Sequence, residues 1–351
     1  MLITYFARMR ADGYFQQFIH PFSQKLLALD TDAMPLHEYS KRYLQHLLHN
    51  HLYYLKIYAT VLGQLVEHSP KTPGEIKMVD YGAGNGLLGM FAKFAGFKKV
   101  WLCDMDADFV DASQMVAAKL SIQIDGFVTG NIEALRYQLA HEQIDAVVGT
   151  DVIEHIYNLE HFFETLAVMN VAMVTVFTTA SNPQNFIKCR QLKKLQLQDE
   201  LHGSDPSDSL LAGAQKTEAF FVLRKQIISE NFPELAPSEL LTLSKATMGL
   251  IKADILAATI NYLQTGKLPL ADNDSTNTCN PFNGSWTERI LSIDAYKKIY
   301  TENNFKLVVR NGFYNDDQLG WKKYVNSLAN EIVKVTGIYA APFISLIGYK
   351  S

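Results

Sequence analysis

Short apolar runs alternate, through the middle of the chain, with longer segments whose apolar residues recur at three- and four-residue steps. The runs predict buried strands, because a strand covered on both faces is apolar throughout, and the stepped segments predict helices that bury one face. The predicted strands are 76–80, 99–104, 122–128, 144–151, 171–178, 305–309 and 343–347. Strands that alternate with helices are typical of an α/β fold with a doubly wound, mostly parallel sheet.

Helical patterns dominate the two regions outside this alternation. The first predicts helices that end in a long one from about Leu36 to Glu67, in which His46, His49 and His51 are expected to be ordinary helix residues. The second predicts a helical insert with a basic, solvated first helix at 187–197. Further helices are expected at 218–230, 238–250 and 253–263. A polar turn is expected at 202–209, and a polar loop at 271–280. The chain is therefore expected to divide into N-terminal helices (1–72), a core (73–185), the insert (186–284) and the C-terminal part of the core sheet (285–351).

A glycine-rich loop, Asp80-Tyr-Gly82-Ala-Gly84-Asn-Gly86, joins the first predicted strand to a helix at 87–94. Glycine lets the chain turn sharply and approach a ligand closely, and the N–H groups at the following helix start point at that ligand. The pattern indicates a nucleotide-type binding loop. From Gly84 onward it also fits the dinucleotide template G-x-G-x-x-G, which alone is a weak signal. The carboxylate of Asp80 would repel a pyrophosphate, but it suits a cationic amino group.

With its acid before the glycines, the loop resembles the first motif of class I S-adenosylmethionine (SAM) methyltransferases, whose cofactor carries an ammonium and a sulfonium. The phrase Asp151-Val-Ile-Glu154-His155 resembles the ubiquinone-biosynthesis O-methyltransferases of that class. The resemblance covers roughly 75–180 and 285–350. It implies a Rossmann-like seven-stranded sheet carrying N-terminal helices and a helical insert, and an enzyme that uses SAM.

The resemblance also assigns the SAM-binding residues. Asp80 and the backbone of Gly82, Gly84 and Gly86 would hold the methionine end of the cofactor. Asp104, at the end of the second strand, would accept hydrogen bonds from the ribose hydroxyls. Met105 would lie against the adenine, the alternative being ordinary packing. The remaining adenine contacts would come from Asn131 and Ile132. Asn131 stands where the family usually has aspartate, and its carbonyl accepts a hydrogen bond without charge.

Asp151 and His155 are the candidate catalytic residues. Asp151 ends the fourth strand, where the methyl should emerge, because open α/β sheets bind ligands at the carboxyl ends of their strands. His155 has three interpretations. It is a general base, since its pKa suits proton removal near neutral pH. It joins Asp151 and Glu154 as a ligand of a divalent metal, since positions i, i+3 and i+4 meet on a helix. Or it helps Glu154 to cap and orient the loop. No metal ligand is assigned.

Composition narrows the partners. A formal net charge of −4 disfavours nucleic acid, which requires a basic surface. Three cysteines, at 103, 189 and 279, show no disulfide or metal spacing and indicate a reducing compartment, with Cys103 a buried thiol. The start of the chain lacks a signal-peptide pattern, and no apolar run reaches membrane-spanning length. A cytoplasmic protein without a membrane partner is expected, and a homodimer is compatible with the sequence.

Three function classes follow. The leading hypothesis is a SAM-dependent methyltransferase acting on an oxygen or nitrogen of a small molecule that the helical additions enclose. In it the insert forms a lid with the N-terminal helices, the alternative being a dimerisation arm. The second hypothesis is a SAM-binding or interaction protein with a degenerate site, suggested by Asn131 and the large insert. The third is an NAD-dependent oxidoreductase, against which Asp80 and the phrase at 151–155 both count.

Overall fold

The computed structural model describes residues 11–203, 217–269 and 275–350. The expected polar turn at 202–209 and loop at 271–280 therefore lie partly outside the described residues. The chain divides into two compact units. The first comprises Met1–Ile153, Leu159–Ala180 and Ser292–Ser351, and the second comprises Glu154–Asn158 and Ser181–Leu291.

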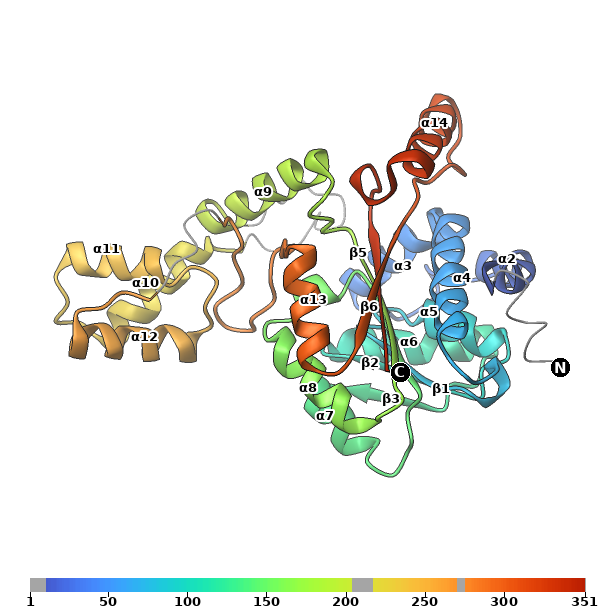
Figure 1. Cartoon of the computed structure of the whole chain (residues 1–351), viewed down its shortest axis with the longest axis horizontal. Helices are drawn as coiled ribbons and strands as arrows, with labels where there is room; N and C mark the ends of the chain where they lie inside the picture. The colour runs from blue at the N-terminus through green and yellow to red at the C-terminus, as the bar shows by residue number, and fades with distance from the viewer. Residues whose placement is uncertain (1–10, 204–216, 270–274, 351) are drawn as a thin grey trace. The chain divides into compact units, whose positions relative to one another are not determined.

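A seven-stranded sheet with the order β3-β2-β1-β4-β5-β7-β6 forms the centre of the first unit (Figure 1). Its strands are β1 (Lys77–Tyr81), β2 (Lys99–Asp104), β3 (Gly126–Thr129), β4 (Ala146–Thr150), β5 (Val174–Thr179), β6 (Lys306–Asn311) and β7 (Ile344–Tyr349). The first five strands are parallel, whereas β7 runs antiparallel to both β5 and β6. The predicted doubly wound, mostly parallel seven-stranded sheet is thus confirmed.

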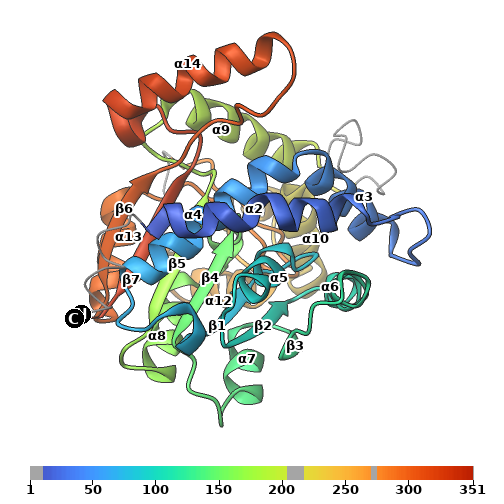
Figure 2. The same cartoon turned by 90° about the vertical axis from the view of Figure 1, so that its right-hand side faces the viewer.

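Helices cover both faces of this sheet, and Figure 2 shows the two layers. One layer contains α4 (His51–Glu67), α5 (Leu87–Phe94) and α6 (Ala107–Leu120), with α2 (Ala11–Leu27) packed on α4. The other contains α7 (Ile132–Gln138), α8 (Leu159–Met169) and α13 (Ile293–Glu302). The apolar core under the first layer joins α2, α4 and α5 to the central strands through fully buried residues such as Phe22, Leu55, Met90 and Val148.

The N-terminal helical region is divided differently from the sequence prediction. Instead of one helix from Leu36 to Glu67, the structure has α3 (Glu38–His49) and α4, which meet at Asn50. Asn50 leaves helical geometry with φ −111° and ψ 23°, and its side-chain amide donates to the carbonyl of His46. An asparagine side chain competes in this way with the helical backbone, whereas the apolar spacing continues across the break and conceals it.

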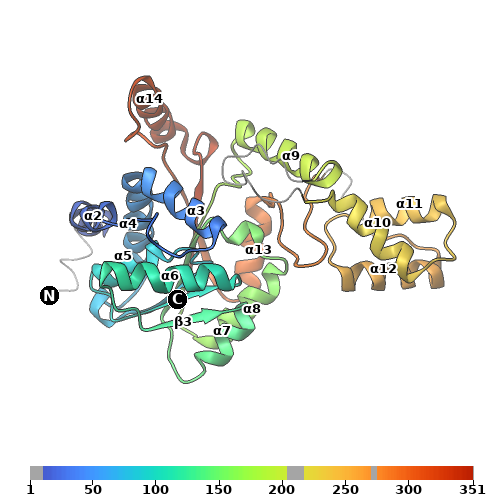
Figure 3. The ribbon, with the colours of Figure 1, turned by 180° about the vertical axis from the view of Figure 1, so that it is seen from behind.

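The second unit has its own helices and its own small core. It contains α9 (Phe186–Leu201), α10 (Phe220–Asn231), α11 (Pro237–Ala246) and α12 (Lys252–Thr265), so the predicted helical insert is present (Figure 3). Ile227, Ile228, Leu243 and Ile255 form the core of α10, α11 and α12. A buried ion pair between Arg224 and Glu200 ties α10 to α9.

The segment 154–158 belongs to this second unit. The indole of Trp286 stacks on Tyr157, with ring centroids 5.9 Å apart, and donates to the carbonyl oxygen of Tyr157 at 3.2 Å. Among the helices of the described ranges, none combines the length and hydropathy that crossing a bilayer requires.

Candidate functional site

The glycine loop connects β1 to α5, and its three glycines all have positive φ, from 52° to 77°. A Cβ on Gly82 would lie 2.3 Å from the Val152 side chain, and one on Gly86 would lie 2.5 Å from Leu102. Packing therefore requires glycine at both positions. At Gly84 the nearest atom to such a Cβ is the ring of Tyr43, at 3.4 Å. Gly84 is thus the glycine that faces the N-terminal helices.

Asp80 lies at the end of β1 and is only 2% exposed. Its carboxylate accepts a hydrogen bond from the Gly89 N–H, at 2.8 Å, in the first turn of α5. A negative charge at a helix N-terminus is stabilised by the helix dipole. Burial, together with the nearby charge of Asp104, nevertheless raises the pKa of Asp80 to about 7. A cationic group beside Asp80 would favour its ionised form, as a ligand ammonium would.

Asp104 ends β2 and fixes the glycine loop from the neighbouring strand. Its two oxygens accept hydrogen bonds from Gly84 N–H at 2.8 Å and from Asp106 N–H at 3.0 Å. Burial raises the pKa of this carboxyl group as well. An ionised carboxylate has about four acceptor positions, so Asp104 can still accept from the hydroxyls of a ribose.

The predicted adenine contacts follow β2 and β3. Met105 is 64% exposed, which contradicts the ordinary packing alternative and leaves its side chain able to cover a base. Ile132 is buried. The Asn131 carbonyl oxygen accepts from the N–H groups of Glu133 and Ala134, at 3.1 and 3.2 Å, and thereby caps α7. The atom expected to receive the adenine amino group thus already has a structural role.

Asp151 follows β4 at the carboxyl edge of the sheet. Its backbone has φ +51°, in the left-handed region that a non-glycine residue rarely adopts. Its N–H donates to the Thr178 carbonyl on β5 at 3.0 Å, which continues the pairing of these strands by one residue. The residue is exposed. The structure therefore places this carboxylate at the same sheet edge as Asp80 and Asp104, as predicted.

Four tyrosines of α3 and α4 lie near Asp151, and we call them the tyrosine cluster: Tyr43, Tyr53, Tyr54 and Tyr58. Burial, together with the charge of Asp151, raises the pKa of Tyr54 to about 12, and burial likewise raises the pKa of Tyr43, Tyr53 and Tyr58 well above its ordinary value. All four phenols are therefore neutral near pH 7 and are able to donate hydrogen bonds.

Ring and polar contacts hold the tyrosine cluster together. The Tyr53 and Tyr54 ring centroids are 5.7 Å apart, and those of Tyr54 and Tyr58 are 6.4 Å apart. The Tyr54 hydroxyl lies 3.0 Å from His46 Nε2. Three of these tyrosines appear in the sequence only as members of the apolar helix stripe, so the pattern predicted their helices but not their function. The feature of the sequence that could have indicated a functional role is the hydroxyl group that each of these aromatic rings carries.

The N-terminal helix α3 contacts the glycine loop directly. Asn85 lies inside the loop, is fully buried, and donates from its side chain to the Ser40 carbonyl of α3 at 3.2 Å. Tyr43 also packs on Phe109 of α6, with ring centroids 5.6 Å apart. Because all these residues belong to the first unit, α3 covers the glycine loop within that unit.

Glu154 and His155 are assigned to the second unit, whereas Asp151 belongs to the first. The Nδ1 atom of His155 lies 2.7 Å from the Trp286 carbonyl oxygen, which can only accept, so Nδ1 carries the proton. His155 Nε2 lies 3.9 Å from a Glu288 oxygen. Across the described parts of the chain, no three His, Cys, Asp or Glu side chains are grouped closely enough to hold a metal ion. These contacts favour the structural interpretation of His155.

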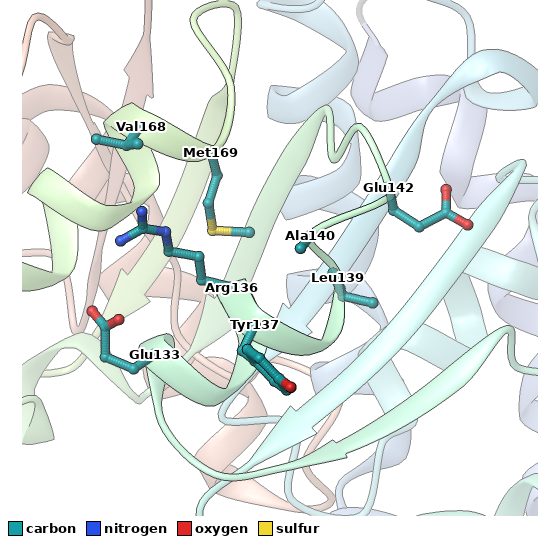
Figure 4. Close-up of a pocket in the computed structure, with 8 residues that line it drawn as sticks. All are labelled: Glu133, Arg136, Tyr137, Leu139, Ala140, Glu142, Val168 and Met169. Carbon is teal, nitrogen blue, oxygen red and sulfur yellow. The ribbon is translucent and has the colours of Figure 1, made fainter.

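A surface hollow of about 490 Å³ lies along α7 and the end of α8 (Figure 4). Its lining residues are Glu133, Arg136, Tyr137, Leu139, Ala140, Glu142, Val168 and Met169. None of the predicted site residues is among them. The hollow is therefore separate from the carboxyl-edge site formed by the glycine loop, Asp104 and Asp151.

Residues 79–169 match a protein-family model described as a methyltransferase domain. No curated protein matches the chain. Among solved structures, a magnesium protoporphyrin IX methyltransferase from Synechocystis with bound SAH is 12% identical, with a TM-score of 0.41 over 88% of this chain and 87% of that one. An S-adenosylmethionine-dependent methyltransferase from Mesorhizobium loti is 9% identical, with a TM-score of 0.41 over 83% and 96%. Likeness at this level carries no inference about a substrate.

The matched segment begins inside β1 and ends with α8, so it contains the glycine loop, Asp104, Asn131 and Asp151. The sheet to which it belongs has the strand order and the antiparallel β7 of a Rossmann-like methyltransferase. Residues 79–169 therefore match a methyltransferase domain, and the sheet around them has a Rossmann-like methyltransferase fold.

Proposed function

We propose that the protein transfers a methyl group from SAM to an oxygen or nitrogen of a small-molecule acceptor. The observation that carries this proposal is the convergence of three carboxylates at one edge of the sheet. Asp80 and Asp104 are hydrogen-bonded to the glycine loop and its helix, and Asp151 lies beside the tyrosine cluster. The first two fit the charges and hydroxyls of SAM, and the third lies where an acceptor would meet the methyl group.

The residues around the loop fit the cofactor chemically. Asp80 is buried and its pKa is raised, so the ammonium group of SAM would stabilise its ionised form. Asp104 has acceptor capacity for the ribose, and exposed Met105 offers an apolar face to the adenine. When bound, SAM supplies an activated methyl group on its sulfonium. The protein then has to align the acceptor with that methyl group, exclude water, and accept a proton where the acceptor releases one.

The tyrosine cluster and Asp151 would form the acceptor side of the site. Neutral phenols can hydrogen-bond an acceptor and enclose it with ring faces, and the carboxylate of Asp151 can accept its proton. We retain His155 as an alternative base, although its Nδ1 is bonded to the Trp286 carbonyl. The link to ubiquinone-type O-methyltransferases, with or without a divalent metal, rests on the phrase at 151–155 alone. The proposal also includes a cytoplasmic location, a possible homodimer and a substrate other than nucleic acid. These three parts rest on the sequence alone.

A second candidate function is SAM binding without catalysis. The observation that favours it is Asn131. Its side-chain oxygen caps α7 and is uncharged, whereas the family usually has at this position an aspartate that contacts the adenine. Such a protein would bind SAM and its demethylated product SAH, and it would not consume SAM with any acceptor.

The test combines binding and turnover on the full chain. Calorimetric titrations with SAM, SAH and NAD should give binding for the first two only. Incubation with methyl-labelled SAM and a metabolite extract should then transfer label to a small molecule, and the Asp151→Asn variant should lose that transfer while it keeps SAM affinity. Binding without transfer from a complete extract favours the second candidate. Binding of NAD in place of SAM refutes both.

A further inference from the structure

Three members of the tyrosine cluster are only partly buried: Tyr43, Tyr53 and Tyr54. The fourth, Tyr58, is 4% exposed and belongs to the apolar core. The hydroxyl of Tyr53 donates to the Phe313 carbonyl oxygen at 3.1 Å, and that of Tyr54 lies 3.0 Å from His46 Nε2. Both hydroxyls are therefore used within the protein, so Tyr53 and Tyr54 offer a ligand their ring faces more readily than their hydroxyls.

Tyr43 and Asp151 both lie against the glycine loop. A Cβ on Gly84 would be 3.4 Å from the Tyr43 ring, and one on Gly82 would be 2.3 Å from Val152, the residue that follows Asp151. Two residues of chain span at most about 7 Å, so both contacts fall on one short stretch of backbone. Burial, and after it the charge of Asp151, raises the pKa of Tyr43, as expected for groups this close.

Every lysine and arginine of α3 and α4 is paired with an acid. The pairs are Lys41 with Asp32, Arg42 with Glu38, and Lys56 with both Asp316 and Asp317. The two helices therefore keep no such side chain for a negatively charged acceptor. A carboxylate or phosphate ester would meet the charge of Asp151 and be repelled, whereas a cation would be attracted by it.

We propose that the methyl acceptor is an amine, bound as a cation against the ring faces of Tyr43, Tyr53 and Tyr54 and beside the Asp151 carboxylate. This inference rests on the proposed methyl transfer and narrows its acceptor atom from oxygen or nitrogen to nitrogen. The face of an aromatic ring attracts a cation, and groups of such rings recognise ammonium ligands in proteins. The carboxylate adds a charged partner, which favours an ammonium over a neutral group of the same shape.

The chemistry of the transfer places positive charge on the acceptor nitrogen. The bound ammonium first gives one proton to the Asp151 carboxylate. The nitrogen lone pair then forms a bond to the methyl carbon, while the bond from that carbon to sulfur breaks and leaves its electron pair on sulfur. The products are SAH and a methylated ammonium. Ring faces stabilise the charge that develops on nitrogen, whereas an oxygen acceptor that loses its proton becomes neutral.

The first experiment separates acceptors by charge. A metabolite extract is divided at neutral pH into a fraction retained by a cation exchanger, a fraction retained by an anion exchanger, and the remainder. Each fraction is incubated with methyl-labelled SAM and the full chain, and we expect transfer only with the cationic fraction. Transfer with either of the others overturns the amine inference and leaves the proposed function intact. No transfer with any fraction refutes the proposed function, and the amine inference with it.

The second experiment tests the rings without turnover, by calorimetry on the full chain loaded with SAH. The probes are tetramethylammonium and tert-butanol, which are similar in shape and differ in charge, and only the first should bind. Tyr54→Leu should weaken this binding about two- to thirtyfold, because the attraction requires the ring. Tyr54→Phe keeps the ring and should bind like the wild type. Tyr137→Leu, at an exposed position on α7 outside the site, is the matched control.

Circular dichroism checks that each variant is folded, and Tyr43→Leu with Tyr43→Phe gives the same comparison on α3 if Tyr54→Leu unfolds. The inference is overturned if tetramethylammonium binds no more tightly than tert-butanol. Equal binding by the leucine and phenylalanine variants also overturns it, because the ring would then have no part. A loss of SAM affinity with unchanged tetramethylammonium binding in Tyr54→Leu is the remaining contrary result, and it assigns the rings to the sulfonium of the cofactor.

Discussion

Two aspartates at neighbouring strand ends, Asp80 and Asp104, determine the geometry of the glycine loop. The carboxylate of Asp104, at the end of β2, accepts a hydrogen bond from the Gly84 N–H. The carboxylate of Asp80, at the end of β1, accepts one from the Gly89 N–H at the start of α5. Each is held by backbone donors, so its position does not depend on a ligand. The cofactor side of the site is therefore preorganised, which lowers the entropic cost of binding.

The ribose assignment of Asp104 can be tested by substitution. Asp104→Ala should weaken SAM and SAH binding roughly tenfold to a hundredfold, because a hydrogen bond to a charged group contributes about 1.5–3 kcal/mol. Calorimetry of the folded variant measures this. Asp111→Ala on α6 is the matched control, since Asp111 is an exposed aspartate of that helix. Unchanged SAM affinity in Asp104→Ala would remove the ribose assignment.

The raised pKa of Asp80 predicts a pH dependence of stability. The ordinary pKa of 3.8 rises to about 7 in the folded protein, so between these values the folded state binds more protons than the unfolded state. Stability from this group is therefore present at low pH and is lost as pH rises from about 4 through about 7. Urea unfolding without cofactor at pH 5 and pH 8 should show the loss. Asp80→Asn should reduce it, and SAM should reduce it in the wild type. The same pH slope in Asp80→Asn would contradict the assignment.

At the scale of elements, the helix starts and the glycine turns determine where the side chains at the strand ends lie. Asp106 caps α6 by accepting a hydrogen bond from the N–H of Asp108, and Asn131 caps α7. The short β3 and the helices α7 and α8 then follow the family order, so residues far apart along the chain meet at one edge. The break at Asn50 turns the predicted single helix into two, and the tyrosine cluster includes residues of both.

Capping and adenine recognition at Asn131 can be separated by two substitutions. Asn131→Ala should lower the free energy of unfolding by about 1 kcal/mol, the usual effect of losing an N-cap. Asn131→Asp should keep the cap, because aspartate caps as well as asparagine. If the residue also faces the adenine amino group, the added charge should raise SAM affinity several-fold. Equal SAM affinity in wild type, Asn131→Ala and Asn131→Asp would exclude residue 131 from adenine binding.

At the scale of the whole molecule, the chain consists of two units with separate cores. The second unit has the apolar core of α10, α11 and α12 and a buried Arg224, which bonds Glu200 and the Ser244 carbonyl. A unit with its own core is not needed to stabilise the sheet of the first unit. We therefore retain the proposal that the insert acts in acceptor binding as a lid.

Replacement of residues 200–280 by a short linker tests the lid. The cofactor residues and the tyrosine cluster belong to the first unit, so SAM binding should remain, whereas methyl transfer should be lost because the acceptor is no longer shielded from water. Calorimetry, the labelled transfer assay and light scattering are the measurements. Retained transfer combined with a change from dimer to monomer would identify the insert as a dimerisation arm instead.

The sequence by itself determined the seven-stranded sheet and most of its helices, and it assigned the residues that would meet SAM, which stays a prediction. Strand burial and helix periodicity are local properties, and the loop glycines have a positive φ that few other residues adopt. Their positions at strand ends follow from the parallel order alone.

Only the tertiary structure decided which other groups meet at that edge and which face the solvent. The tyrosines of α3 and α4 read as apolar stripe residues until packing places them beside Asp151. His155 has three interpretations in the sequence, and its contact with the Trp286 carbonyl, 131 positions away, favours the structural one. In each case the deciding contact joins residues distant in sequence, and a local pattern contains no record of such a contact.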